Sequence, residues 1–336
     1  MNTQAKEKTS TKNSLINKLV KIVLPIALGV LILYFLFRDT NFEEMWRVVK
    51  NANWGILAFS LLFGLLGNTI RGYRWELLIK PLGYSPKIST LNYAIYGGYA
   101  VNFALPRAGE VWRCGIVAKE EKIPFVKLIG TMILDRILDT ITVATLLLIV
   151  FCFNMDFLIT ELSKNPSLDS LATLLKSPLL YIGIAIIIIL TIIIFKYFGN
   201  IGIVKKITNL ALGMWNDLKT IWRMKTKNRL ILYTLGIWGS YFLYFYITFF
   251  AFEFTENLGI VAGLTAFALS SLSMGVPTNG GMGAWHFAVV AALALYGIDK
   301  TQSMAFATGV FTLQSCWVIF CGLIGIAILS LRKTKQ

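Results

Sequence analysis

The stretch ISTLNYAIYGGYAVNFALPRAGEVWRCGIV, residues 88–117, decides the fold, because Pro106 interrupts an otherwise apolar run inside it. Proline lacks a backbone donor and clashes with the preceding helical turn, so a half-helix is predicted on each side of it. The stretch LTAFALSSLSMGVPTNGGMGAWHFAVVAALALYG, residues 264–297, is interrupted in the same way at Pro277. Each stretch is therefore predicted to form a pair of half-helices.

The remainder of the chain has the composition of an α-helical membrane protein. Of its 336 residues 56% are hydrophobic, and the mean hydropathy is +0.68. Apolar runs recur at about the length that a hydrocarbon core of ~30 Å requires of a helix, and the alternating segments of a membrane β-barrel do not occur. Six full spans are predicted, at residues 22–37, 54–70, 128–153, 178–195, 230–252 and 302–330.

The basic residues behind the net charge of +15 gather in one set of loops. That set carries 23 of the 32 Lys and Arg residues with five acids, and comprises residues 1–21, 71–87, 119–127, 196–229 and 332–336. The other set carries six basic residues with nine acids, and comprises residues 38–53, 154–177, 253–258 and 298–301. The two sets of loops lie on opposite sides of the membrane only if the stretches 88–118 and 259–297 do not cross it. Each of these stretches must enter the membrane and return to the side from which it entered. The positive-inside rule then places both termini in the cytoplasm of a bacterial inner membrane.

The predicted fold is an all-α polytopic integral membrane protein with six full transmembrane helices and two oppositely oriented re-entrant helical hairpins. A cytoplasmic N-terminal tail, residues 1–18, precedes a transmembrane domain at residues 19–331. Its halves, 19–153 and 178–331, each hold three full helices and one hairpin, so the second half must run inverted relative to the first. The basic loops would face anionic membrane lipids, so no nucleic-acid partner is expected.

A cytoplasmic amphipathic helix is predicted at residues 203–222, within the basic loop 196–229 that links the halves. It lies either on the lipid surface or packed on the protein. In an accessory protein, this helix would be the part that docks an envelope enzyme.

Charged residues inside predicted membrane segments are candidate functional residues, because hydrocarbon makes them costly. Three follow Pro106 at three-residue spacing, and three belong to the motif DRILD at residues 135–139. They are Arg107, Glu110, Arg113, Asp135, Arg136 and Asp139. The two aspartates lie one turn apart on one helix face, and Arg107 or Arg113 is expected to pair with them. The alternative to a substrate site is an ion-pair cluster that only holds the hairpin shut.

The two interrupted stretches also supply uncharged candidates. The helix after Pro106 would direct its free N–H groups and positive dipole end into the membrane, where an anion would be stabilised. Near Pro277, glycines leave the backbone free to bend, and the single histidine of the chain follows them. The candidates here are Asn279, Gly280, Gly281, Gly283 and His286. His286 either packs as a buried hydrogen-bonding group or carries a proton.

Arg71 and Arg74 stand near the end of the second predicted span. They are expected to snorkel toward lipid phosphates, or to gate a phosphate-bearing headgroup. The four cysteines show no metal or redox spacing and are interpreted as small hydrophobic residues. Neither a metal nor a cofactor is expected.

Four elements carry a resemblance to a known family: RGYRWELLIKPLG (71–83), NFALPRAGEVWR (102–113), DRILD (135–139) and VPTNGGMGAW (276–285). Together they resemble the flippase-like transmembrane domain of lysylphosphatidylglycerol synthases, which also occurs without the synthase domain. In the larger synthases this domain looks to translocate an aminoacylated phospholipid that a separate soluble domain has made. The resemblance does not imply lipid aminoacylation by this chain. The sequence departs from the family at Asn279, where a second proline is common, and at His286, where an acid is common.

The predicted function is translocation of a lipid or lipid-linked anionic molecule across the inner membrane. Arg107, Arg113 and the half-helix ends near the two prolines would hold the phosphate. Asp135 and Asp139 would orient those arginines or contact a cationic headgroup.

Two other functions stay open from the sequence. One is ion- or proton-coupled transport of a small solute, which would depend on Asp139. The other is a non-transport role as an accessory protein of an envelope enzyme, with a homo-oligomer as a further possible assembly. Enzymatic activity is not expected, because the chain shows no nucleophile–base set and no metal-ligand spacing.

Overall fold

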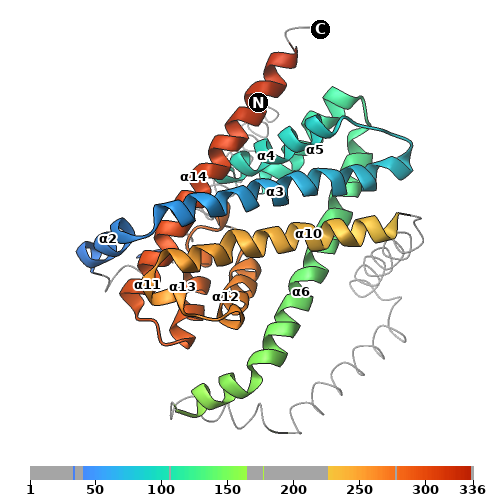
Figure 1. Cartoon of the computed structure of the whole chain (residues 1–336). Helices are drawn as coiled ribbons and strands as arrows, with labels where there is room; N and C mark the ends of the chain where they lie inside the picture. Colours follow the sequence, from blue (N-terminus) through green and yellow to red (C-terminus); the bar gives the residue numbers. More distant parts are fainter. Residues whose placement is uncertain are drawn as a thin grey trace, which may run out of the picture. The chain divides into compact units, whose positions relative to one another are not determined.

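The computed structural model describes residues 33–34, 41–105, 107–164, 177, 226–276 and 278–333. Every regular element in those ranges is a helix (Figure 1). The chain divides into two compact units, one comprising residues 1–147 and 232–336 and the other residues 148–231. Several predicted features lie outside the described residues: the tail 1–18, most of the span 22–37, the span 178–195, the helix 203–222, Pro106 and Pro277.

Two asparagines start the first described helices. Helix α2 (Phe42–Asn51) follows Asn41, whose side chain accepts hydrogen bonds from the amides of Glu43 and Glu44 at 3.1 and 3.2 Å. Helix α3 (Trp54–Ile79) follows Asn53, which caps its first turn in the same way, and it continues into η1 (Lys80–Leu82). These caps satisfy amides that a helix start leaves without a partner.

Within the described ranges, four helices are long and apolar enough to cross a membrane: Trp54–Leu82, Phe125–Phe153, Lys227–Ala251 and Lys300–Arg332. They belong to α3 with η1, α6 (Phe125–Lys164), α10 (Lys227–Tyr246) with η2 (Ile247–Ala251), and α14 (Lys300–Lys333). Four of the six predicted spans therefore lie in helices of sufficient length. A short helix, α11 (Glu253–Glu256), follows η2.

Both interrupted stretches fold as pairs of shorter helices. The first pair is α4 (Ile88–Ala104) and α5 (Ala108–Glu121), of 17 and 14 residues. The second pair is α12 (Ile260–Ser273) and α13 (Ala284–Leu295), of 14 and 12 residues, with η3 (Asn279–Gly281) between them. At about 1.5 Å per residue, each helix is shorter than a hydrocarbon core of ~30 Å. The predicted helix break is present in both stretches.

The members of each pair pack on each other, and α14 packs along α4 (Figure 1). One apolar cluster joins α3, α4, α5 and α6 around Trp75, Leu91 and Leu128. A second, aromatic cluster joins α10, α12, α13 and α14 around Phe245, Phe267 and Phe306. Each helix pair thus has its own apolar core.

Glycines allow the first pair to approach closely. A Cβ at Gly109 would overlap the carbonyl oxygen of Gly98, and one at Gly98 would lie 2.9 Å from the carbonyl oxygen of Gly109. On the other side of α4, Gly322 and Gly325 of α14 face its backbone in the same manner. Small residues at such crossings are what permits close packing between membrane helices.

Gly109→Ala is therefore expected to destabilise the protein by about 1–3 kcal/mol, because the added methyl group must push α4 and α5 apart. Gly115→Ala on the same helix is the matched control, since a Cβ there meets no atom within 4 Å. The control should be neutral or slightly stabilising. Denaturant-induced unfolding in detergent micelles measures both. Equal stability of the two variants would show that the close approach at Gly109 is absent.

Candidate functional site

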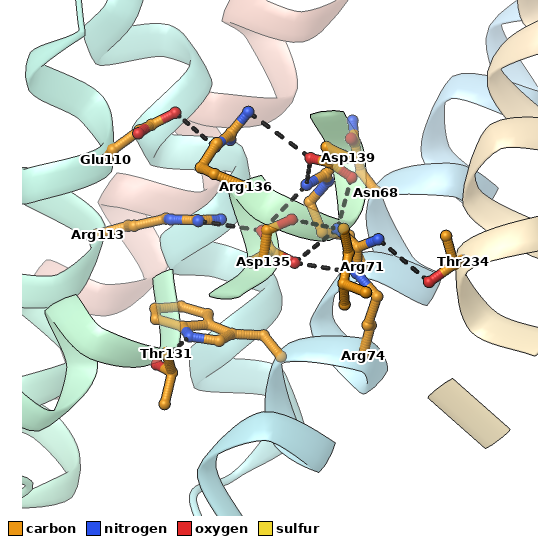
Figure 2. A network of polar contacts seen from close by, with 12 residues as sticks. Asn68, Arg71, Arg74, Glu110, Arg113, Thr131, Asp135, Arg136, Asp139 and Thr234 are labelled. Carbon is orange, nitrogen blue, oxygen red and sulfur yellow. Dashed lines mark hydrogen bonds and ion pairs between the residues drawn. The ribbon is translucent and has the colours of Figure 1, made fainter. Parts of the chain in front are cut away.

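Two arginines of α3 and two aspartates of α6 form the centre of a buried ion-pair cluster (Figure 2). Nη2 of Arg74 lies 2.6 Å from Asp135 and 2.7 Å from Asp139. Nη1 of Arg71 lies 3.1 Å from Asp135 and 2.7 Å from Asp139. The side chains of Arg71 and Arg74 are only 3% and 0% exposed. The two arginines lie three residues apart on α3 and the two aspartates lie four residues apart on α6, which is about one helical turn in each case. The two positive side chains can therefore face the two negative ones.

Arg113 of α5 joins this cluster from a third helix. Its Nη2 lies 3.2 Å from Asp135, and its guanidinium lies over the Trp75 ring, 4.8 Å from the ring centroid. The Trp75 indole in turn donates to the Thr131 hydroxyl at 2.9 Å. A cation between a carboxylate and an aromatic face is favourably placed when it is desolvated. Among the described residues, Nε of Arg113 has no hydrogen-bond partner.

Arg136 and Glu110 form the more exposed edge of the cluster. Nε of Arg136 lies 2.8 Å from Glu110, and its Nη1 lies 3.7 Å from Asp139. Their side chains are 39% and 27% exposed. This pair is therefore less enclosed by protein than the pairs of Arg71 and Arg74 with the aspartates.

Helix α10 supplies uncharged partners that the sequence analysis did not identify. The Tyr241 hydroxyl donates to Asn68 at 2.6 Å and accepts from Nε of Arg71 at 3.3 Å. Thr234 accepts from Nη1 of Arg74 at 3.3 Å, and the Trp238 indole donates to Asp139 at 3.4 Å. Positions 234, 238 and 241 share one helix face, and that spacing of polar atoms in an apolar span was the available signal.

The structure corrects one prediction about the arginines and confirms another. Arg71 and Arg74 do not snorkel toward lipid phosphates, because their side chains are buried and held by the two aspartates. The prediction that Arg107 or Arg113 pairs with the aspartates is confirmed by Arg113. Arg107 instead donates from Nη2 to the carbonyl oxygen of Gly275 at 2.6 Å.

That bond belongs to a junction between the ends of the two helix pairs. The Asn279 side chain donates from Nδ2 to the carbonyl oxygen of Phe103 at 3.2 Å. Gly280 lies against the Phe103 ring so closely that a Cβ there would overlap it. We call this contact region, formed by residues 103–105, 107, 275, 276 and 278–280, the hairpin junction. Within the described part of the chain, Arg107 is exposed and has no carboxylate partner.

The glycines near Pro277 bend the backbone as predicted. Gly280, Gly281 and Gly283 have φ angles of 59°, 84° and 81°, which only glycine adopts freely. His286 follows on α13, where it is buried with its ring centroid 4.6 Å from that of Phe311. Its Nδ1 has no hydrogen-bond partner among the described residues.

The backbone amides at the start of α5 were expected to face an anion, but one of them, that of Gly109, already has a hydrogen-bond partner. The Gly109 amide donates to the Asn102 side chain at 2.8 Å. The start of this helix therefore offers fewer free N–H groups than the sequence suggested. In the described residues, no group of His, Cys, Asp or Glu could hold a metal ion.

The charges inside the helices do not balance. The five arginines of the cluster and the junction are Arg71, Arg74, Arg107, Arg113 and Arg136. The three acids that lie among them are Glu110, Asp135 and Asp139. All three acids are bonded to arginines of the cluster, so the excess positive charge is most accessible at Arg107.

Comparisons with known proteins agree on one family. The sequence model described as "Lysylphosphatidylglycerol synthase TM region" matches residues 22–322. The chain is similar to "Glycosyltransferase AglD" of Haloferax volcanii, with 26% identity over 163 residues, 48% of this chain and 25% of that protein. It is also similar to "UPF0104 membrane protein MJ1595" of Methanocaldococcus jannaschii, with 25% identity over 126 residues, 37% of this chain and 38% of that protein. The match thus spans well under half of either relative, and no solved structure matches the chain.

Proposed function

Because the chain belongs to the family of the lysylphosphatidylglycerol synthase transmembrane region, we propose that it moves a lipid or lipid-linked anionic molecule across the membrane. The family and the four long apolar helices make it a multi-pass membrane protein. The family describes a transmembrane region, which supports a transport role over an enzymatic one.

The observation that carries the proposal is the state of Arg107. This guanidinium is exposed at the hairpin junction and is bonded to a backbone carbonyl of Gly275. A neutral carbonyl leaves its charge uncompensated, and an uncompensated charge in a membrane interior is costly. A phosphate would neutralise it and accept two parallel N–H bonds from the planar guanidinium. Arg107 is therefore the proposed phosphate contact during translocation.

The buried cluster supports the same proposal in a different role. Arg113, Arg71 and Arg74 are already bonded to Asp135 and Asp139, so they are poorly placed to hold a substrate. Instead they join α3, α5 and α6 and would keep the first helix pair in position. Arg113 therefore fits the alternative of an ion-pair cluster that holds the hairpin shut, and Arg107 fits the substrate-binding role.

The proposed membrane layout has six full spans and two re-entrant hairpins that enter from opposite sides. Both termini and the loop 196–229 would lie in the cytoplasm of a bacterial inner membrane, and the halves 19–153 and 178–331 would be an inverted repeat. Helix lengths of 12 to 17 residues in the two pairs support re-entry, since such helices are too short to span.

Cysteine labelling tests this layout. In a background without the four native cysteines, Asp299→Cys is expected to react with an impermeant maleimide added outside intact cells, because residues 298–301 would face outward. Glu121→Cys, placed after the first pair, should react only after the membrane is opened. Labelling of Glu121→Cys from outside would overturn the re-entrant layout.

Lipid movement in vesicles tests the function itself. The purified chain is reconstituted with a trace of fluorescent phosphatidylglycerol, and dithionite destroys the dye in the outer leaflet. We expect dithionite to reach nearly all of the dye in protein-containing vesicles and only the outer-leaflet dye in protein-free vesicles. If the two preparations behave alike, lipid translocation is excluded, and solute transport or an accessory role would take its place.

A further inference from the structure

The hairpin junction holds buried polar atoms that have no partner within the described residues. Thr278 is only 6% exposed, and its hydroxyl oxygen forms no hydrogen bond with the described residues. Oδ1 of Asn279 is also buried and has no partner in that part of the chain, although Nδ2 of the same side chain donates to Phe103. Both residues follow Gly275, whose carbonyl accepts from Arg107, within the same short segment. The junction therefore combines one accessible cation with two unused neutral groups.

Such groups need a partner other than the described residues of the chain. A buried polar atom without a hydrogen bond is costly, so it is normally satisfied by another group, by ordered water or by a ligand. The amide oxygen of Asn279 can only accept a hydrogen bond, whereas the hydroxyl of Thr278 can donate one and accept others. A bound hydroxyl group can satisfy both, because it donates and accepts as well.

An ammonium group would fit this site poorly. It could donate to Asn279, but it would bring a second positive charge beside Arg107, which costs energy at low dielectric. The acid that lies one turn further along α5, Glu110, is 2.8 Å from Arg136 and is thus engaged elsewhere. Among the described residues, the junction has no carboxylate bonded at Arg107.

Building on the proposed function, we infer that the junction selects an anionic headgroup that carries uncharged hydroxyl groups and no ammonium. The phosphate contacts Arg107, and hydroxyls of the headgroup bond to Thr278 and Asn279. Phosphatidylglycerol and lipid-linked sugar phosphates have this chemistry. Phosphatidylethanolamine and aminoacylated lipids do not.

Three fluorescent lipids with the same acyl chains test the inference in vesicles containing the full chain. Phosphatidylglycerol has the phosphate and hydroxyls, phosphatidylmethanol has the phosphate alone, and phosphatidylethanolamine adds an ammonium. We expect phosphatidylglycerol to move about 5- to 30-fold faster than phosphatidylmethanol, the factor for one to two hydrogen bonds, and phosphatidylethanolamine to move slowest. Equal rates for all three, or a faster phosphatidylethanolamine, would overturn the inference. If none of the three lipids moves, that result contradicts the proposed function instead.

Substitutions of Thr278 test whether its hydroxyl causes the preference for phosphatidylglycerol over phosphatidylmethanol. Thr278→Val is expected to lower the ratio of phosphatidylglycerol to phosphatidylmethanol rates toward one, and Thr278→Ser should restore it. The matched control is Thr308→Val, which removes another buried hydroxyl without a partner, next to Gly309 where α14 meets Val49 of α2. It should leave the ratio at the wild-type value. If Thr278→Val slows both lipids equally, the hydroxyl serves the fold or binds only water, and the inference fails.

A charge introduced at the same place gives an independent result. Asn279→Asp supplies a carboxylate beside Arg107, so it should raise the rate for phosphatidylethanolamine above its wild-type value. Because this outcome is an absolute gain for one lipid, a misfolded variant cannot produce it. An unchanged preference in a variant that still moves lipid would show that Asn279 does not contact the headgroup.

Discussion

Replacing Asp135 by asparagine is expected to lower the free energy of unfolding by about 3–5 kcal/mol, the cost of leaving a buried charge without its partner. Asp135 is fully buried and accepts from Arg71, Arg74 and Arg113 on two other helices. Asparagine keeps the size of the side chain and removes its charge. Asp139 would then be the one remaining carboxylate among those three buried guanidinium groups.

Denaturant-induced unfolding in detergent micelles measures this effect, with Glu110→Gln as the control. Glu110 also pairs with an arginine, but the pair is 27% and 39% exposed and Arg136 retains Asp139 at 3.7 Å, so the loss of Glu110 should cost less than the loss of Asp135. Adding Arg113→Gln to Asp135→Asn removes one uncompensated charge and should recover part of the stability. Asp135→Asn and Glu110→Gln of equal stability would contradict the cluster described here.

Replacing Arg107 by glutamine is expected to lower the rate of phosphatidylglycerol translocation by about 10- to 100-fold, the range for hydrogen bonds to a charged group. The same change should leave the unfolding free energy nearly unaltered, because Arg107 is exposed and bonds to one carbonyl. Arg107→Lys keeps the positive charge but lacks the planar guanidinium, so its translocation rate should lie between those of the wild type and Arg107→Gln.

The backbone at this position guides the choice of substitutions. Arg107 has a φ of 61°, in the left-handed region where asparagine and glycine are favoured. Arg107→Asn would therefore relieve strain and remove charge at once, whereas glutamine and lysine change the side-chain chemistry alone. A wild-type rate for Arg107→Gln, in vesicles with equal amounts of protein, would exclude Arg107 as the phosphate contact.

Much of the fold could be predicted from hydrophobic runs and prolines. The spans around 128–153 and 302–330 and both helix breaks follow from length, composition and the lack of a proline N–H. The pairing of Arg113 with the aspartates was also accessible, because charges one turn apart on apolar helices must find partners.

The residues of α3 and α10 that belong to the cluster around the two aspartates were harder to predict, for physical reasons. Arg71 and Arg74 stand near a helix end, where a long cation can equally reach lipid phosphate or turn inward. Tyr241 and Trp238 carry one polar atom on a large apolar ring, so sequence alone does not separate a cluster ligand from a membrane-interface anchor.

The hairpin junction could not be predicted at all from residue types. Arg107 and Asn279 both donate to backbone carbonyl oxygens, those of Gly275 and Phe103. Every residue has such an acceptor, so no side-chain pattern indicates which one is used. Only the three-dimensional arrangement separates Arg107, which has no carboxylate partner among the described residues, from the paired Arg113.

Arg107 at the hairpin junction is the proposed contact for the phosphate of the transported lipid. A cryo-EM map of the chain in nanodiscs of phosphatidylglycerol would show this contact. We expect headgroup density at the junction, with phosphate oxygens about 2.7–2.9 Å from the Arg107 guanidinium, as in charge-assisted hydrogen bonds. Headgroup density bound instead to Arg71, Arg74 or Arg113, with Arg107 still bonded to Gly275, would contradict it.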